Sequence, residues 1–198
     1  MKKILILLSA TTILACNSSK EKQSTIKTTE KVSFASKNNK AEKMNETVPY
    51  EESVMILGKA NRAGLQNEAF KDWFGPGYES YNPDSGVVEK LKPLLKDVQI
   101  TVFMGTWCED SHREVSYLYK VLDKTGYDES QLTVIAVSEE KTTPQRFEKG
   151  KNITHVPTII FNKNVKEMGR IVEFTIQTLE QDMLAILSGA DYKNPYSE

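Results

Sequence analysis

The chain has 198 residues, with 26 Lys and Arg against 27 Asp and Glu, which gives a formal net charge of −1 at pH 7. This length suits one domain of ordinary size with additional segments. Because basic and acidic residues are interspersed, the sequence lacks the basic stripe that nucleic-acid binding requires, and we expect no nucleic-acid partner.

The first residues have the pattern of an export signal. Two lysines precede an apolar run over residues 4–15, which is too short to span a bilayer comfortably. Ala15-Cys16 ends this run and resembles the lipobox of bacterial lipoproteins, in which the cysteine is acylated. The resemblance implies that residues 1–15 are a lipoprotein signal peptide. It also implies that Cys16 anchors the chain to a bacterial membrane in the cell envelope, facing the periplasm or the surface. An ordinary secretory signal and a weak membrane anchor are the alternatives.

Two segments separate this signal from the main domain. Residues 16–46 are rich in Ser, Lys, Asn, Thr and Glu. They cannot bury enough apolar surface to offset chain entropy, and they are predicted to form a flexible tether. Residues 47–97 are predicted to form an N-terminal extension that packs on the domain. This packing is favoured by a group of aromatic residues, which are Tyr50, Trp73, Phe74, Tyr78 and Tyr81. A substrate-docking face formed by the same residues is the alternative.

Helix signals mark the second half of this extension. A short helical stretch at residues 68–74 is predicted to stop at the Gly-Pro-Gly sequence of residues 75–77. A longer helix over residues 86–95 is predicted to be capped by Asp84 or Ser85.

Strands and helices alternate over residues 98–190, which favours an α/β fold with a central mixed β-sheet flanked by helices. Residues 132–137 are rich in branched apolar side chains and fit a buried parallel strand. The remaining 191–198 form a C-terminal tail. The predicted order is strand 99–104, helix 108–124 closed by Gly126, strand 132–137, short helix 144–149, strand 157–161, antiparallel edge strand 166–172, and a last helix that Thr175 or Thr178 caps and Gly189 ends.

Cys108 lies where the first central strand ends and the next helix begins. Val115, Leu118 and Leu122 fall on one face of that helix. The free N–H groups and the dipole at a helix N-terminus stabilise an anion, which favours the thiolate, the nucleophilic form of cysteine. This position makes Cys108 the first candidate for chemistry, although a lone cysteine is also common as a small buried apolar residue.

The sequence Trp107-Cys108-Glu109-Asp110-Ser111, followed later by Val156-Pro157, resembles the thioredoxin family. That family has W-C-x-x-C at this junction, so the chain carries a single-cysteine C-x-x-S variant. The resemblance implies a thioredoxin-like fold and a cis peptide bond before Pro157 that faces Cys108. It also implies that the Val156 backbone pairs with an incoming peptide. The residues implied for catalysis are Cys108, Ser111, Trp107 and Pro157, and those implied for substrate binding are Val156, Thr106 and His112.

Ser111 limits the chemistry that such a site can perform. Thiol–disulfide exchange needs a thiolate that attacks a disulfide and a second thiol that resolves the mixed disulfide. A serine hydroxyl cannot resolve it, and acylation of Cys16 would leave Cys108 as the only thiol. The expected mechanism is therefore monothiol, with cysteine-containing envelope proteins or small thiols as partners and no cofactor.

Neighbouring charges are expected to act on Cys108 in opposite directions. Glu109 and Asp110 disfavour the thiolate. His112 and Arg113 favour it if their side chains turn toward the sulfur. His112 also fits a solvated helix residue without a role.

Two other functions are alternatives. Val102 stands where thioredoxins carry a buried Asp that assists proton transfer, in line with a catalytically degenerate binding or adaptor module on the same fold. Cys108, His112 and His155 together offer one thiolate and two imidazoles, a set that suits copper or zinc. No paired-cysteine motif supports a metal site, so no metal ligand is assigned.

Overall fold

The computed structural model describes residues 43–197. The signal peptide predicted at residues 1–15, the lipidation site at Cys16 and most of the tether predicted at residues 16–46 lie outside the described residues. Within residues 43–197, no helix is long and apolar enough to cross a membrane.

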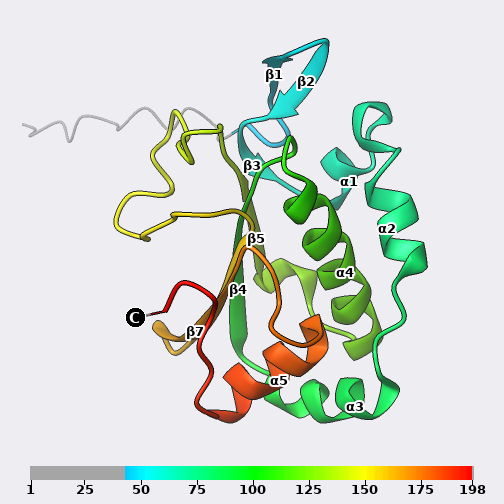
Figure 1. The fold of residues 1–198 in the computed structure, drawn as a ribbon, viewed down its shortest axis with the longest axis vertical. Coiled ribbons are helices and arrows are strands. Elements are labelled where there is room, and N and C mark those ends of the chain that lie inside the picture. Colours follow the sequence, from blue (N-terminus) through cyan, green and yellow to red (C-terminus); the bar gives the residue numbers. More distant parts are fainter. Residues whose placement is uncertain (1–42, 198) are drawn as a thin grey trace, which may run out of the picture. The chain divides into compact units, whose positions relative to one another are not determined.

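The central element is a mixed five-stranded β-sheet (Figure 1). Its strands are Gly58–Ala60 (β3), Val98–Met104 (β4), Leu132–Ala136 (β5), Thr158–Lys163 (β6) and Lys166–Val172 (β7). Their order in the sheet is β3-β5-β4-β6-β7. The central strand β4 pairs in parallel with β5, and the other pairs are antiparallel. The predicted mixed sheet is confirmed.

Side chains of β4 alternate between the two faces of the sheet, as expected of a pleated strand. Val98, Ile100, Val102 and Met104 are fully buried in the larger of two apolar cores, whereas Phe103 belongs to the smaller one. Hydrogen-bonded neighbours on both sides hold β4 along its length. The residues that follow Met104 therefore start from a fixed point.

Helices cover one face of the sheet and enclose the larger core (Figure 1). They are Arg62–Leu65 (α1), Phe74–Ser80 (α2), Ser85–Leu94 (α3), Glu109–Thr125 (α4) and Leu179–Ser188 (α5). Helix α4 contacts α2, α3 and α5, so it lies at the centre of this layer. Its residues Val115 and Leu118 are fully buried, and each such side chain stabilises the fold by roughly 1.5–3 kcal/mol.

The opposite face of the sheet is covered by residues 137–157, which contain no helix or strand (Figure 1). The smaller core lies beneath this long loop, and Phe147 and Ile153 of the loop pack against it. Its buried members are Phe103, Ile135, Val137, Val156 and Ile160.

The prediction of a short helix at residues 144–149 is wrong. Glu148 Oε2 accepts hydrogen bonds from Thr143 N (3.1 Å) and Thr143 Oγ1 (2.8 Å), and Phe147 N donates to Thr143 Oγ1 (2.9 Å). Arg146 has a left-handed φ of 61°, which a helix does not accommodate. Side-chain bonds to the backbone thus replace the helical ladder in this loop.

The Gly-Pro-Gly sequence at residues 75–77 lies inside a helix instead of stopping one, contrary to the prediction. Pro76 falls in the first turn of α2, where backbone N–H groups have no partner within the helix and a proline is tolerated. The helical stretch expected before it is reduced to a 3-10 turn at Glu68–Phe70 (η1). Helix α2 then packs along α4.

Most predicted helix ends are confirmed. Asp84 caps α3 by accepting a backbone N–H of its first turn, and Gly126 and Gly189 end α4 and α5 with left-handed φ angles of 70° and 77°. Thr178 is the N-cap residue of α5 but makes no side-chain cap bond. The buried carboxylate of Asp182 instead accepts two backbone N–H groups that precede this helix, at 2.6 and 3.1 Å.

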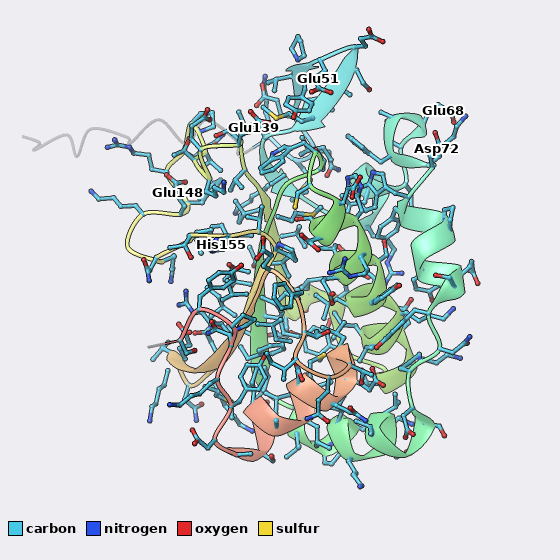
Figure 2. The ribbon with its side chains drawn as sticks, in the orientation of Figure 1. Glu51, Glu68, Asp72, Glu139, Glu148 and His155 are labelled. Carbon is cyan, nitrogen blue, oxygen red and sulfur yellow. The ribbon has the colours of Figure 1, made fainter. Side chains whose placement is uncertain are left out.

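A hairpin formed by β1 (Thr47–Tyr50) and β2 (Ser53–Ile56) precedes the sheet. The Tyr50 hydroxyl donates to Glu139 Oε1 (2.8 Å) in the long loop, where Figure 2 labels Glu139. Ile56 N donates to Thr106 Oγ1 (3.1 Å). The N-terminal segment thereby reaches the loop that follows β4.

Candidate functional site

Cys108 is the N-cap residue of α4, directly after the short loop that follows β4. Its backbone is extended (φ −102°, ψ 122°), and its carbonyl oxygen accepts the hydrogen bond from His112 N (3.0 Å) that opens the helix. The N–H groups of Glu109, Asp110 and Ser111 therefore belong to the first helical turn, next to the cysteine. The predicted strand–helix junction at Cys108 is confirmed.

The loop of residues 105–107 is held from several sides. Gly105 N donates to Ser111 Oγ (3.1 Å), and Trp107 Nε1 donates to the Val137 carbonyl oxygen (2.9 Å). A Cβ at Gly105 would lie 2.5 Å from the Trp107 ring, so only glycine fits here. Ser111 is fully buried, and its hydroxyl fixes the start of the loop.

The peptide bond between Val156 and Pro157 is cis, as the resemblance implied. Cys108 Sγ lies 3.3 Å from the Val156 carbonyl oxygen and donates its S–H to it. Two segments that are far apart in the sequence thus meet at the end of β4. The predicted contact between Cys108 and Val156 is confirmed.

Cys108 borders the smaller apolar core. The side chains of Cys108 and Trp107 are partly buried and pack against this core together with two apolar residues of the long loop. Cys108 is a free thiol and the only cysteine among residues 43–197. A partner that reaches the sulfur therefore also meets apolar side chains.

His112, expected to bind substrate, has internal partners. Its imidazole stacks on Trp73, with the ring centroids 4.2 Å apart and the planes 10° from parallel, and its Nε2 lies 2.8 Å from the Thr106 carbonyl oxygen. Because a carbonyl oxygen only accepts, Nε2 carries the hydrogen. Burial lowers the pKa of His112 below its ordinary value. The ring is therefore neutral at pH 7 and offers no positive charge to the sulfur.

Arg113 is likewise engaged elsewhere. Its guanidinium forms ion pairs with Asp110 (2.8 Å) and with Glu114 (2.9 Å) on the same helix. Glu109 is exposed to solvent. The basic charges that were expected to favour the thiolate are thus a neutral imidazole and a guanidinium paired with carboxylates.

Thr106, also expected to bind substrate, is buried, and its polar atoms have internal partners. Its Oγ1 accepts a hydrogen bond from Ile56 N (3.1 Å) of the hairpin, and its carbonyl oxygen accepts one from His112. In the structure Thr106 links the hairpin, the site loop and α4.

Glu114 is a buried carboxylate on α4, one turn beyond the site. Its side chain is 4% exposed; Oε1 accepts a hydrogen bond from Arg113 Nε, whereas Oε2 has no hydrogen-bond partner. Burial raises the pKa of Glu114 above its ordinary value, and the carboxylate of Asp182 on α5 acts in the same direction. Asp182 itself accepts a hydrogen bond from the Tyr192 hydroxyl (3.0 Å).

His155 lies in the segment that leads from the long loop into the cis-proline (Figure 2). Its ring stacks on Tyr196 of the C-terminal tail, with centroids 3.8 Å apart and planes 13° from parallel. The Tyr196 hydroxyl bonds to the carboxylate of Glu173, whose backbone N–H donates to the Pro157 carbonyl oxygen (2.7 Å). The tail is therefore attached to residues 155–157, which we call the cis-proline loop.

The three residues considered for copper or zinc do not form a site. Cys108, His112 and His155 each have the separate partners described above. Within the part of the chain that the structure describes, no group of three His, Cys, Asp or Glu side chains is arranged to hold a metal ion.

Some residues around the site were not assigned to it from the sequence. Trp73 was noted only as one of several aromatic residues, because its stacking on α4 depends on how α2 packs. Ile56 and Val137 act through backbone groups, for which the residue type gives no signal. Ser111 was implied only for catalysis, and its bond to Gly105 N adds a structural role.

No family model matches the chain. No curated protein matches it either. Similar solved structures include a protein of unknown function from Pseudomonas aeruginosa, with 15% identity, a TM-score of 0.47 and coverage of 60% of this chain and 84% of that chain. An HIV epitope scaffold has 15% identity, a TM-score of 0.47 and coverage of 61% and 85%. Mitochondrial thioredoxin 3 from Saccharomyces cerevisiae, in its oxidized form, has 19% identity, a TM-score of 0.30 and coverage of 48% and 86%. At these TM-scores the likenesses do not define a fold family for this chain.

Proposed function

We propose that the chain is a lipid-anchored, thioredoxin-like thiol–disulfide oxidoreductase of the cell envelope that acts through Cys108 by a monothiol mechanism. The observation that carries the proposal is the contact between Cys108 Sγ and the Val156 carbonyl oxygen (3.3 Å), directly before the cis bond to Pro157. A free thiol at a helix N-terminus, beside a cis-proline and partly exposed, combines a nucleophile with an edge of backbone for a peptide.

The order of elements also supports a thioredoxin-like fold. The sequence β4, α4, β5, β6, β7, α5 follows the order of that family, with Cys108 after the first of these strands. The chain departs from the family where residues 137–157 contain no helix between β5 and β6. This departure leaves the face beside Cys108 to a loop, which gives a different surface to a partner.

The proposed reaction has two exchange steps. The Cys108 thiol loses its proton to solvent, and the thiolate attacks a disulfide of an envelope protein. A bond forms between Cys108 and one substrate sulfur, and the other sulfur leaves as a thiolate. An external thiol, from a small molecule or a second protein, then attacks the mixed disulfide. It forms a new disulfide with the substrate sulfur and returns Cys108 to its reduced state.

The neighbouring residues have separate parts in this reaction. Val156 offers its backbone to the peptide that carries the disulfide, so the S–H bond to its carbonyl oxygen must open when substrate binds. Pro157 fixes the direction of that backbone. Trp107 shapes the apolar side of the site, and Thr106 and His112 hold the loop that carries Cys108.

The mechanism is tested by trapping on Cys108. Purified protein is incubated with a peptide disulfide, and adducts are measured by mass spectrometry, with Cys108→Ser as the blank. Wild type should accumulate a mixed disulfide that only added reductant releases. If wild type forms no adduct and matches the blank, the nucleophilic role of Cys108 is wrong.

The membrane anchor is tested on Cys16. If Cys16 is acylated, Cys16→Ser should release the protein from membranes or leave it unprocessed in a bacterial host. Equal membrane partition of mutant and wild type, with no acyl mass on the mature N-terminus, would contradict the anchor.

A binding or adaptor module is the second candidate. The Cys108 side chain packs against the smaller core, and the guanidinium of nearby Arg113 is paired with carboxylates, which favours a structural role for the thiol. In that case the protein would bind its partner equally well after Cys108→Ser. Partner binding in the blank variant therefore separates the two candidates.

A further inference from the structure

An aromatic contact between the N-terminal segment and α4 lies next to the candidate site. Trp73 stacks on His112, with ring centroids 4.2 Å apart and planes 10° from parallel. His112 Nε2 in turn donates to the carbonyl oxygen of Thr106 (2.8 Å), which lies in the loop leading to Cys108. A continuous path of direct contacts therefore joins Trp73 to the loop that carries the cysteine.

Trp73 is itself fixed by aromatic side chains of the larger core. It meets Phe74 edge-on, at 5.7 Å between centroids, and Phe70 at a tilt, at 6.2 Å. Phe74 meets Tyr119 of α4 edge-on at 5.3 Å. Phe70, Phe74 and Tyr119 are each at most 2% exposed, so they hold the indole plane in place.

The close packing of α2 on α4 explains why Trp73 and His112 meet. A Cβ at Gly77 would lie 2.8 Å from Ser116 Cβ, so the two helices approach here as only glycine allows. Gly77 and Ser116 each lie four positions after a member of the stacked pair, and residues at this spacing share one helix face. Gly77 N also donates to the Trp73 carbonyl oxygen (2.9 Å), and Ser116 Oγ donates to that of His112 (2.6 Å). The close approach at Gly77 therefore places Trp73 over His112 one turn away.

We propose that Trp73 is a positioning residue of the Cys108 site. It holds the His112 imidazole on the Thr106 carbonyl oxygen. This bond fixes the loop from which Cys108 meets Val156. The inference rests on the proposed function, because it concerns how the thiol is presented to a disulfide. Trp73 has no part in the reaction itself and acts through His112.

The proposal predicts which reactions of Cys108 depend on Trp73. Exchange with a peptide disulfide needs the sulfur beside the Val156 backbone, so it depends on a fixed loop. Alkylation by iodoacetamide needs only access to the sulfur. Loss of the stack should therefore lower the ratio of the exchange rate to the alkylation rate. A stack of aromatic rings contributes the equivalent of a factor of about 3 to 10 in an equilibrium constant.

The test uses the full chain and two readouts. The first is the tautomer of His112 by nitrogen-15 NMR, and the second is the ratio of the two rates across pH. Trp73→Ala should give mixed tautomers and a ratio lower by about 3- to 10-fold. Trp73→Phe, which keeps a ring over the imidazole, should restore much of both. Tyr117→Ala is the matched control, because it removes another stack of α4, that on Tyr81 (4.0 Å, 9°), and should leave both readouts unchanged.

Substitutions of His112 repeat the test without replacing an aromatic residue of the larger core. His112→Gln keeps an N–H donor within reach of the Thr106 carbonyl and should retain the wild-type ratio of rates. His112→Ala should lower the ratio as Trp73→Ala does. If His112→Ala leaves the ratio at its wild-type value, the positioning role is overturned.

The outcomes distinguish failure of this inference from failure of the proposed function. If Trp73→Ala destabilises the fold as Tyr117→Ala does but leaves the His112 tautomer and the rate ratio unchanged, Trp73 is a packing residue and the inference is wrong. If wild type forms no mixed disulfide, the proposed function fails. In that case an unchanged tautomer in Trp73→Ala still overturns the inference, and mixed tautomers still support its structural part.

Discussion

Ser111→Cys is a direct perturbation of the proposed monothiol mechanism. The change places a second thiol in the first turn of α4, three positions after Cys108. A thiolate there attacks a mixed disulfide on Cys108 from within the molecule and displaces the substrate sulfur. The adduct of the variant should therefore be short-lived, whereas the wild-type adduct waits for an external thiol.

The structure also sets the stability cost of this change. Ser111 is fully buried and accepts the hydrogen bond from Gly105 N (3.1 Å), which a sulfur atom accepts only weakly. An unsatisfied buried N–H and overpacking by the larger sulfur together cost about 2–4 kcal/mol. A disulfide that closes so short a ring returns about 2 kcal/mol. The reduced variant should thus be less stable than wild type by about 2–4 kcal/mol, and oxidation should recover about 2 kcal/mol of this loss.

Two measurements with one matched control decide the outcome. Adduct lifetime is followed by mass spectrometry, and the free energy of unfolding is measured in urea with and without reductant. Ser111→Ala loses the same hydrogen bond without gaining a thiol or overpacking the site. It should therefore keep the long adduct lifetime and lose only the hydrogen-bond contribution to stability, about 1–3 kcal/mol. Equal adduct lifetimes in the two variants would refute the internal attack. Wild-type stability in Ser111→Ala would refute the structural role of the hydroxyl.

Three further changes test the packing around the site. Gly77→Ala puts a Cβ 2.8 Å from a buried serine of α4 and should lower the free energy of unfolding in urea by about 1–3 kcal/mol. The control is Gly75→Ala, because a Cβ at this position meets nothing within 4 Å. This variant should raise the free energy of unfolding by up to about 1 kcal/mol. Equal effects of the two substitutions would contradict the close helix contact. Glu114→Gln removes a buried acid whose pKa burial raises, so wild-type stability falls as pH rises through the folded-state pKa. The stability of the variant relative to wild type should therefore increase between about pH 4 and neutral pH. A difference that does not change with pH in urea titrations would count against this. Tyr196→Ala removes the stack on His155 of the cis-proline loop. Amide hydrogen exchange of residues 152–156 should become faster, and the loss of stability should stay below about 1.5 kcal/mol. Unchanged exchange would argue against the attachment of the tail.

The elements around the larger core could be predicted from the sequence because their apolar pattern is strong. The central strand β4 and the helix α4 are buried by neighbours on several sides, so their side chains repeat with the period of a strand and of a helix. The glycines that end α4 and α5 were predictable for a local reason, since both take a left-handed φ. In these elements local preference and tertiary packing agree.

Predictions failed where a distant contact or a side-chain bond outweighs the local pattern. The Gly-Pro-Gly sequence at residues 75–77 suggests a turn, but its proline falls where a helix tolerates it, and Gly77 is required by the contact with Ser116. At residues 144–149 the bonds between Thr143 and Glu148 compete with a helix. Neither effect has a signal in the short sequence window from which a helix is predicted.

The candidate site divides in the same way. The contact between Cys108 and the cis-proline loop could be predicted because the resemblance includes both segments and implies that they face each other. The partners of His112 did not, because its choice among solvent, the sulfur and an internal carbonyl depends on the side chain that lies above it. Only the packing of α2 on α4 supplies that side chain, which is Trp73.

The serine at position 111 links the chemistry to the fold. Its hydroxyl accepts the N–H of buried Gly105, the first residue after β4, and a thiol accepts such a bond poorly. A second cysteine at position 111 would therefore loosen the loop of residues 105–107. The carbonyl oxygen of Thr106 in this loop accepts the hydrogen bond from His112. A dithiol site and this rigid loop compete for the same position on α4. The competition disappears when the resolving thiol comes from another molecule, because the side chain at position 111 then needs only to accept the hydrogen bond from Gly105 N. Under the proposed monothiol mechanism, which needs an external thiol, the C-x-x-S sequence and the fixed approach of Cys108 to Val156 therefore belong together.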